Sequence, residues 1–313
     1  MNGPSNINPP GVTHSNMASE SDTGAQAFSS AAVSAGRPLY WSVRRELWEN
    51  RAIYLAPLAV AAIYLCGFLV NVINLRRHMR TVAWTHETFA MPYEMVATVI
   101  MGTAFLVGIF YTLDALYGER RDRSILFWKS LPVSDLTVVL SKLIIPLAVL
   151  PLLSFAITVV TQFIMLLLSS VVLLGSGLNV ATIWTHSSFI HVSLLLLYHI
   201  VTVHGLWYAP FYGWFLLVSA GAPRAPFVWA FLPPFVIVAV EKLTFNTSYL
   251  AAMLLHRLMG PEAPTPPGSS MMDVMASLTL ARFLVEPGLW IGLGVAAVFV
   301  AAAIQVRRYR GPI

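Results

Sequence analysis

The chain has 313 residues, of which 57% are hydrophobic and 11% are charged, and its mean hydropathy is +0.72. A soluble domain is nearer half apolar and a quarter charged, and a membrane barrel would show alternating short segments instead of long apolar runs. The net charge of +5 does not indicate nucleic acid binding, because the arginines lie beside apolar runs, where they report topology. The composition predicts an all-α polytopic membrane protein. The only cysteine, Cys66, lies in an apolar run, so no intramolecular disulfide is possible.

The N-terminal part of the chain precedes the first apolar run. Residues 1–37 are rich in Ser, Ala, Asn, Gly and Pro and lack an apolar signal-peptide core, which predicts a disordered tail. Residues 38–52 predict an amphipathic helix in the membrane interface, because Tyr40, Val43 and Leu47 share one helical face with tryptophans beside it.

Uncharged runs long enough to cross a bilayer follow along the chain. We predict six spans, at about 53–73, 95–117, 143–174, 189–219, 227–245 and 288–306. The run 143–223 contains no Asp, Glu, Lys or Arg; its single turn-like interruption favours two spans, although three would leave the charge distribution nearly unchanged. If both termini are cytoplasmic, most of the 19 Lys and Arg residues lie on the cytoplasmic side, including a basic tail at 307–313. We predict this orientation because basic residues favour the cytoplasmic side. An outer loop, 246–286, contains amphipathic stretches at 249–258 and 271–284.

The loop at 118–142 concentrates the charge of the chain. It contains "GERRDRSILFWKSLP", in which a short helix would be stopped by Pro132 and a new one capped by Ser134. Ile125, Trp128 and Leu131 lie near one face of that helix, bordered by basic residues. Two interpretations remain open: an anchor on anionic lipid, or a docking helix for a soluble partner, for which Trp and Arg are favoured.

Motifs for chemistry are absent from the sequence. No lysine follows a glycine, so no Walker phosphate loop exists, and neither HExxH nor GxSxG occurs. We therefore expect no catalytic residue, metal site or cofactor in this chain. His199, His204 and Glu241 are candidates for a substrate or proton path, since ionisable groups inside a membrane are functional candidates. His199 and His204 are five residues apart, about 140° on an α-helix, and would not converge on one ion.

Small residues recur in the last span. Gly288, Gly292 and Ala296 are four apart and give one helix face that allows close backbone contact. Packing within the bundle and packing against another subunit both remain open.

Three stretches resemble the permease subunits of type-2 ATP-binding cassette (ABC) exporters. They are "LDALYGERRDRSILFWKSLPVSDLTVVLSK" (113–142), "VRRELWENRAIYLAPL" (43–58) and "APFYGWFLLVSAGAPRAPFVWAFLPPFVIVAVEKLTF" (209–245). The resemblance implies a coupling helix in the loop between spans two and three, seated in a cleft of a cytosolic ATPase. It also implies a homodimer or heterodimer of permeases, with ATP and Mg bound on the separate ATPase chains. The coupling residues would be Asp114, Glu119, Arg120, Arg121, Arg123 and Lys129, which hold the loop and meet the partner, and Ile125, Phe127, Trp128 and Leu131, which insert.

With this resemblance, the sequence predicts a permease subunit that transports through a path at a dimer interface. The subunit would be integral to a plasma membrane, and the resemblance implies a bacterial inner membrane. Two alternatives are a proton- or ion-coupled secondary carrier using His199, His204 and Glu241, and a non-transporting membrane anchor.

Overall fold

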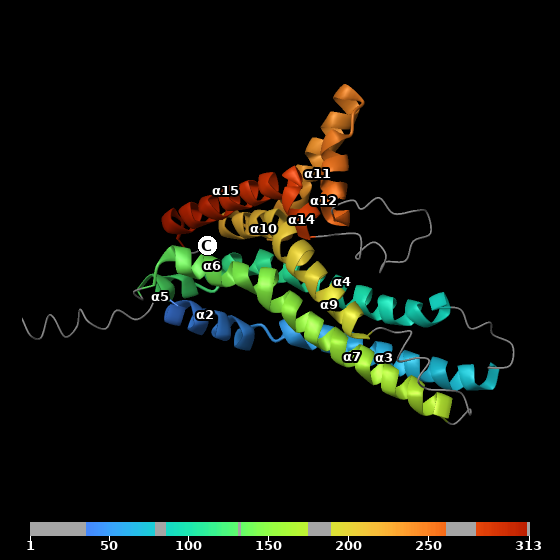
Figure 1. Cartoon of the computed structure of the whole chain (residues 1–313). Helices are drawn as coiled ribbons and strands as arrows, with labels where there is room; N and C mark the ends of the chain where they lie inside the picture. The colour runs from blue at the N-terminus through green and yellow to red at the C-terminus, as the bar shows by residue number, and fades with distance from the viewer. Residues whose placement is uncertain (1–35, 79–85, 131–132, 175–188, 261–279, 312–313) are drawn as a thin grey trace, which may run out of the picture.

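Helices account for the architecture of the protein. The computed structural model describes residues 36–78, 86–130, 133–174, 189–260 and 280–311 (Figure 1). Its elements are α2 (Gly36–Glu49), α3 (Ala52–His78), α4 (His86–Arg121), α5 (Ser124–Ser130), α6 (Asp135–Ile144), the π-helix η1 (Ile145–Val149), α7 (Leu150–Leu174), α9 (Phe189–His199), the π-helix η2 (Ile200–Trp207), α10 (Ala209–Gly221), α11 (Pro226–Phe245), α12 (Tyr249–Met259), α14 (Leu280–Val285) and α15 (Pro287–Tyr309). These ranges contain no strand, which confirms the all-α class. Most of the predicted tail and residues 261–279 of the outer loop lie outside the described residues.

Long apolar helices make this a multi-pass membrane protein. Five helices in the described ranges are long and apolar enough to span a bilayer, at Ala52–Val72, Met91–Arg121, Asp135–Val171, Pro226–Phe245 and Pro287–Tyr309. A further pair, Ser193–Trp207 and Ala209–Gly221, passes the same test together but is bent by 44°; counted as one span, it gives the six that were predicted.

The third and fourth spans depart from straight α-helices. The third begins eight residues before its predicted start, because α6, η1 and α7 follow one another without a break. The fourth bends at Tyr208, and Pro210 in the first turn of α10 has no N–H with which to continue η2. The two π-helices contact each other. Gly205 of η2 makes this contact close, since a methyl group there would lie 3.4 Å from the Leu147 carbonyl oxygen of η1.

α10 lies at the centre of one part of the bundle, against α4 and α15. Its side chains Tyr212 and Leu216 are buried. Gly108 of α4 admits the Tyr212 ring, because a methyl group at that glycine would lie 3.0 Å from the Tyr212 hydroxyl oxygen. α3 packs against α4 and α7 in the other part of the bundle. Within a bilayer such contacts stabilise the fold through close packing more than through the hydrophobic effect.

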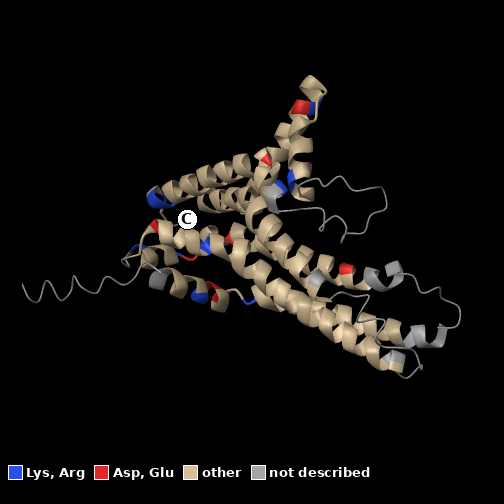
Figure 2. Cartoon of the chain, viewed as in Figure 1, with Lys and Arg blue, Asp and Glu red and all other residues tan. Residues whose placement is uncertain are grey.

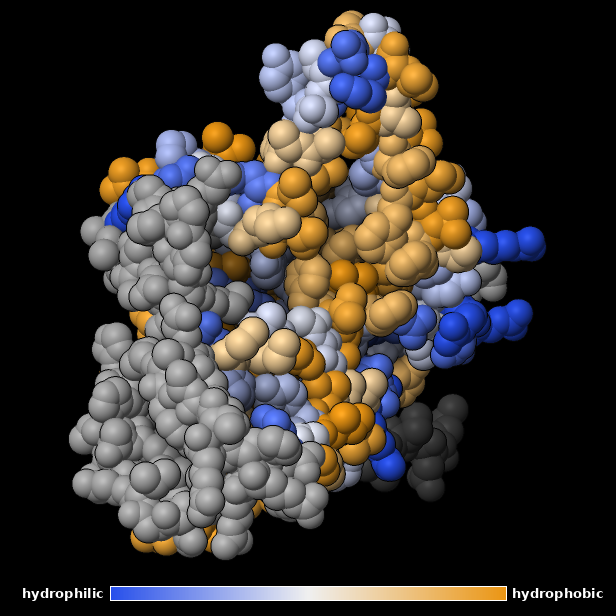
Figure 3. Space-filling view, turned by 90° about the vertical axis from the view of Figure 1, so that its right-hand side faces the viewer, coloured by the Kyte–Doolittle hydropathy of each residue, from blue (hydrophilic) through white to orange (hydrophobic). Residues whose placement is uncertain are grey.

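α11 and α12 form a hairpin that projects from the bundle (Figures 1 and 3). Along α11, which is described throughout, only Ala230 is buried. The base of the hairpin is fastened by hydrogen bonds from Trp214 Nε1 to the Ala230 carbonyl (3.0 Å) and from Tyr208 Oη to the Leu258 carbonyl (2.9 Å). Figure 3 shows a polar tip above an apolar surface on this hairpin. α12 corresponds to the predicted amphipathic stretch 249–258, and α14 to the described end of the second one.

Candidate functional site

Charged side chains gather at one end of the bundle, where α2, α5, α6 and the end of α15 meet (Figure 2). Among the described residues, the charged side chains buried there are Glu46, Glu119, Arg120, Lys142 and Arg307. A buried charge is costly unless it is paired and hydrogen-bonded. At this end four of the five are ion-paired and Arg120 is hydrogen-bonded to backbone carbonyls, all through contacts between different helices; Glu119 Oε1 and Arg307 Nε make their ion pairs without a hydrogen bond.

A chain of ion pairs, here called the charge network, runs through Glu46, Lys142, Glu119, Arg307 and Asp135. Lys142 Nζ lies 2.7 Å from Glu46 Oε1 and 3.1 Å from Glu119 Oε1. Arg307 Nη1 lies 3.1 Å from Glu119 Oε2, and Arg307 Nε lies 3.3 Å from Asp135 Oδ1. Glu119 is therefore shared by both cations. The charge network joins α2, α4, α6 and α15 at one place.

Further hydrogen bonds extend from this end of α4. Tyr111 Oη donates to Glu46 Oε2 at 2.9 Å. Arg120 Nη1 donates to the carbonyls of Ala220 (2.9 Å) and Ala222 (3.0 Å), at the C-terminal end of α10. A cation there satisfies carbonyls that lack helical partners and complements the helix dipole. The predicted coupling residues Glu119 and Arg120 thus lie inside the chain, where they hold α4 to its neighbours.

The short helix α5 follows directly from α4. Arg123 separates the two helices with a left-handed φ of 59°, an uncommon conformation for a residue with a side chain. α6 then starts as the sequence predicts: Ser134 is its N-cap, and its hydroxyl accepts a hydrogen bond from the Thr137 N–H at 3.1 Å. Pro132, predicted to stop α5, lies outside the described residues, as does Leu131 of the predicted insertion set.

The bundle covers one face of α5 and leaves the other face exposed. Ile125 is 1% exposed, and Trp128 is half-buried, with the Arg45 guanidinium of α2 over its ring at 4.4 Å. Leu126 and Phe127, by contrast, are 57% and 56% exposed. Helical spacing places Ile125 and Trp128 together but does not show which side the bundle covers. In this conformation Ile125 faces the bundle, and Phe127 is the exposed described residue of the predicted insertion set; insertion into a partner stays a prediction. The sequence did not single out the exposed Leu126.

The remaining predicted coupling residues lie at the surface around α5. Asp114, Arg121, Arg123 and Lys129 are exposed, and Arg121 Nη1 lies 3.7 Å from Asp114 Oδ1. Lys129 Nζ donates to the Arg310 carbonyl at 3.2 Å, which connects α5 with the end of the chain. Exposed basic residues therefore flank exposed apolar ones, and we call Leu126, Phe127, Arg121, Arg123 and Lys129 the α5 surface.

The sequence analysis did not identify the partners in the charge network. Lys142 and Arg307 were counted only for topology, and Glu46 was not singled out at all. A signal for Glu46 existed, since it lies between the apolar positions Val43 and Leu47 of an amphipathic helix. Its partner could not be found that way, because Lys142 is 96 residues further along the chain.

His199 and His204 approach each other more closely than the sequence suggests. Their ring centroids are 5.9 Å apart, and the His204 ring also packs against Tyr208 at 5.3 Å. The prediction that they point apart assumed an α-helix; η2 is π-helical, and its i to i+5 hydrogen bonding brings residues five apart onto one side. Within the described part of the chain the Nδ1 atoms of both rings lack a hydrogen-bond partner. Across the described part of the chain, no group of three His, Cys, Asp or Glu side chains could hold a metal ion.

Glu241 lies near the C-terminal end of α11 and bonds to the start of α12, whereas His199 and His204 belong to α9 and η2. Its Oε1 accepts hydrogen bonds from the Tyr249 N–H (2.6 Å) and the Thr247 hydroxyl (3.0 Å), and its Oε2 accepts one from the Leu250 N–H (3.0 Å). The carboxylate thereby satisfies free N–H groups at the start of α12. The structure does not combine Glu241 with the histidine pair into one path.

The small residues of α15 contact other parts of the same chain. A methyl group on Gly288 would lie 3.5 Å from the Trp207 ring, and Ala296 faces Gly213 of α10. A methyl group on Gly292 would overlap the guanidinium of Arg257, which lies 4.2 Å over the Trp207 ring and donates to the Gly288 carbonyl at 2.7 Å. Burial lowers the pKa of Arg257. The small face of α15 therefore packs against η2, α10 and α12 within the chain.

Comparison with protein-family models, curated proteins and solved structures gave no match. Function is therefore argued from the geometry of this chain.

Proposed function

We propose that the chain is the permease subunit of an ABC exporter, coupled through the α5 surface to a cytosolic ATPase on a separate chain. The observation that supports this proposal is the combination of an exposed docking face with a buried attachment. Leu126 and Phe127 are presented to solvent, while Ile125 and the Trp128–Arg45 contact fix the opposite side of α5 to the bundle.

The charge network provides the mechanical connection in this mechanism. α5 is covalently continuous with α4, which carries Glu119, and Glu119 is paired with Lys142 of α6 and Arg307 of α15. A displacement of α5 by the ATPase therefore moves the ends of several spans together. The fourth span is bent by 44° just after η2, which contacts η1, and π-helical turns and prolines weaken the regular hydrogen-bond ladder there.

The partners in this proposal follow from the missing phosphate loop. ATP and Mg bind to the ATPase, and this chain supplies no catalytic residue. Two permease chains, identical or different, form the path between them in a bacterial inner membrane. The absence of a Gly-Lys pair from the sequence supports an energy source on another chain.

The test targets the exposed face of α5. Phe127→Glu, and separately Arg121→Glu with Arg123→Glu, should abolish co-purification with the ATPase and its transport-coupled hydrolysis. The matched controls are Phe127→Leu and the two Arg→Lys changes, which keep the apolar or cationic character and should retain most of the binding. Trp128→Ala is a weaker probe, because it also removes the internal contact with Arg45. Unchanged binding and hydrolysis in the Glu variants would refute the coupling assignment.

The histidine pair favours a second candidate, a proton-coupled carrier. Two imidazoles with buried Nδ1 atoms that lack a partner among the described residues, beside a π-helix, are suited to accept a proton or a polar substrate. This alternative expects transport that follows a proton gradient without any ATPase, and its loss in His199→Ala. Partner binding without any flux would instead indicate a membrane anchor.

A further inference from the structure

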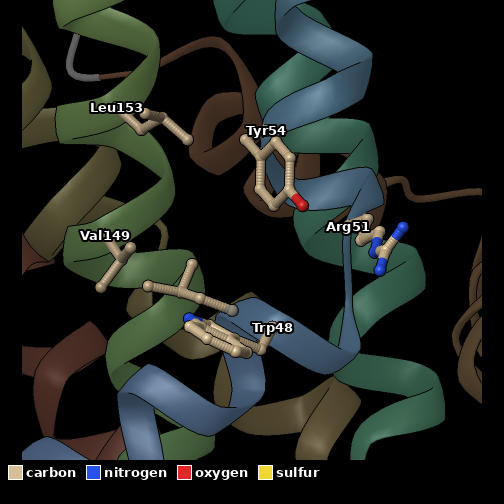
Figure 4. A pocket seen from close by; sticks show the side chains of 6 residues that line it. Trp48, Arg51, Tyr54, Val149 and Leu153 are labelled. Carbon is tan, nitrogen blue, oxygen red and sulfur yellow. The ribbon is translucent and has the colours of Figure 1, made fainter.

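A groove opens at the corner between α2 and α3, on the side facing η1 and α7. Its volume is about 540 Å³, and its lining residues are Leu47, Trp48, Arg51, Tyr54, Val149 and Leu153. Figure 4 shows Trp48 and Tyr54 facing Val149 and Leu153 across the space, with Arg51 at the edge. The size lies within the roughly 300–1,000 Å³ of ordinary ligand sites.

The lining combines apolar walls with aromatic and cationic groups at one end. Leu47, Val149 and Leu153 are aliphatic, whereas Trp48 and Tyr54 are the residue types that prefer the headgroup region of a bilayer. Arg51 is exposed, and its side chain makes no hydrogen bond or ion pair with any described residue. An unpaired guanidinium beside an apolar groove is complementary to an anionic ligand with an apolar part.

Neighbouring charges reinforce the positive end of the groove. The Arg44 guanidinium lies 5.7 Å from the Trp48 ring centroid, so a second cation borders the same tryptophan. Arg45 and Glu49 pair with each other at 2.6 Å and add no net charge. Glu46, on the buried side of α2, is held by Lys142. The exposed end of α2 is therefore positive at the mouth of the groove.

The direction of the groove matches the orientation of a lipid. Trp48 and Arg51 lie at the junction of α2 and the first span, within five residues of Glu46 of the charge network. Val149 lies seven residues, or about 10 Å along a helix, beyond Lys142 of the charge network, and Leu153 lies a further turn on. The apolar wall thus continues from the charged end toward the membrane interior.

We propose that this groove binds an anionic phospholipid, with an acyl chain along Val149 and Leu153 and the phosphate on Arg51. The lipid would lie against η1, since Val149 is the last residue of that π-helix. It would also fix the angle between α2 and α3. This proposal is independent of the proposed function, because it concerns the α2–α3 corner and not the α5 surface.

The test uses the full chain in detergent, with phosphatidylglycerol or phosphatidylcholine added and bound lipid counted by native mass spectrometry. Wild type should retain phosphatidylglycerol in preference to phosphatidylcholine. Arg51→Gln should weaken phosphatidylglycerol binding roughly five-fold, the effect of one basic residue near a lipid headgroup. Leu153→Trp, which fills the groove, should remove the bound lipid. Val149→Phe, on the η1 side of the groove, also narrows it and is the substitute variant if Leu153→Trp does not fold.

The matched control is Arg224→Gln, which removes an exposed arginine outside the groove and should bind as wild type does. Equal loss in Arg224→Gln and Arg51→Gln would overturn the proposal, since it would indicate attraction by overall charge. Phosphatidylcholine bound as tightly as phosphatidylglycerol would also overturn it, because the occupant would then be any acyl chain. Wild-type binding by a folded groove-filling variant would show that the lipid lies elsewhere.

Discussion

The charge network and the histidine pair both bring polar side chains into the bundle, but only the charge network consists of ion pairs. Glu119 is shared by Lys142 and Arg307, and these cations also pair with Glu46 and Asp135, so removal of Lys142 or Arg307 leaves a carboxylate without its cation. His199 and His204 have Nδ1 atoms without hydrogen-bond partners among the described residues, in a span bent by 44°. The first region fixes helices to one another. The second retains polar groups that no neighbour occupies, which is expected of a site that binds or moves something.

Breaking the charge network should have the largest effect. Glu119→Gln removes the carboxylate between two buried cations, which keep Glu46 and Asp135 as their other partners. We expect a loss of about 1.5–3 kcal/mol in the free energy of unfolding, typical for a lost hydrogen bond to a charged group. Equilibrium unfolding in mixed SDS micelles measures this loss. Asp114→Asn is the matched control on the same helix, because its ion pair is exposed, and it should change stability little. Equal effects of both changes would show that the charge network is not structurally special.

Replacing both members of one pair should cost less than the two single changes together. Glu46→Leu and Lys142→Leu each leave a buried charge, whereas the double variant removes both charges at once. We expect a coupling free energy of about 0.5–3 kcal/mol in a double-mutant cycle, measured by the same unfolding assay. Additive effects would mean that the 2.7 Å contact contributes nothing beyond its separate residues.

The smallest effect on stability is expected at the histidine pair. His204→Leu loses no hydrogen bond at Nδ1 and keeps an apolar volume in the bundle, so the free energy of unfolding should change by about 1 kcal/mol or less. Transport should nevertheless be impaired if the pair lines the path. A flux assay on the reconstituted variant, together with its unfolding curve, separates these roles. A large loss of stability would instead place His204 among the residues that hold the bundle together.

Hydropathy predicted most of the fold because span length and charge exclusion are local properties of the chain. The cap at Ser134 was predictable for the same reason, since it depends on the next three residues. The π-helices were not, because their altered hydrogen bonding depends on prolines and on contact with another span. The orientation of α5 could not be predicted either. Helical spacing places Ile125 and Trp128 on one face, but only the packed bundle shows that this face is the covered one.

The α11–α12 hairpin has a consequence for folding order. Because only Ala230 of α11 is buried among its described residues, the hairpin shares little surface with the rest of the chain. Its attachment depends on a few contacts at its base, such as the Arg257 guanidinium over Gly292 and Trp207. Segments with few buried contacts open independently and at lower free energy than the core. Among the described helices, those of the hairpin should therefore be the last to dock against the bundle.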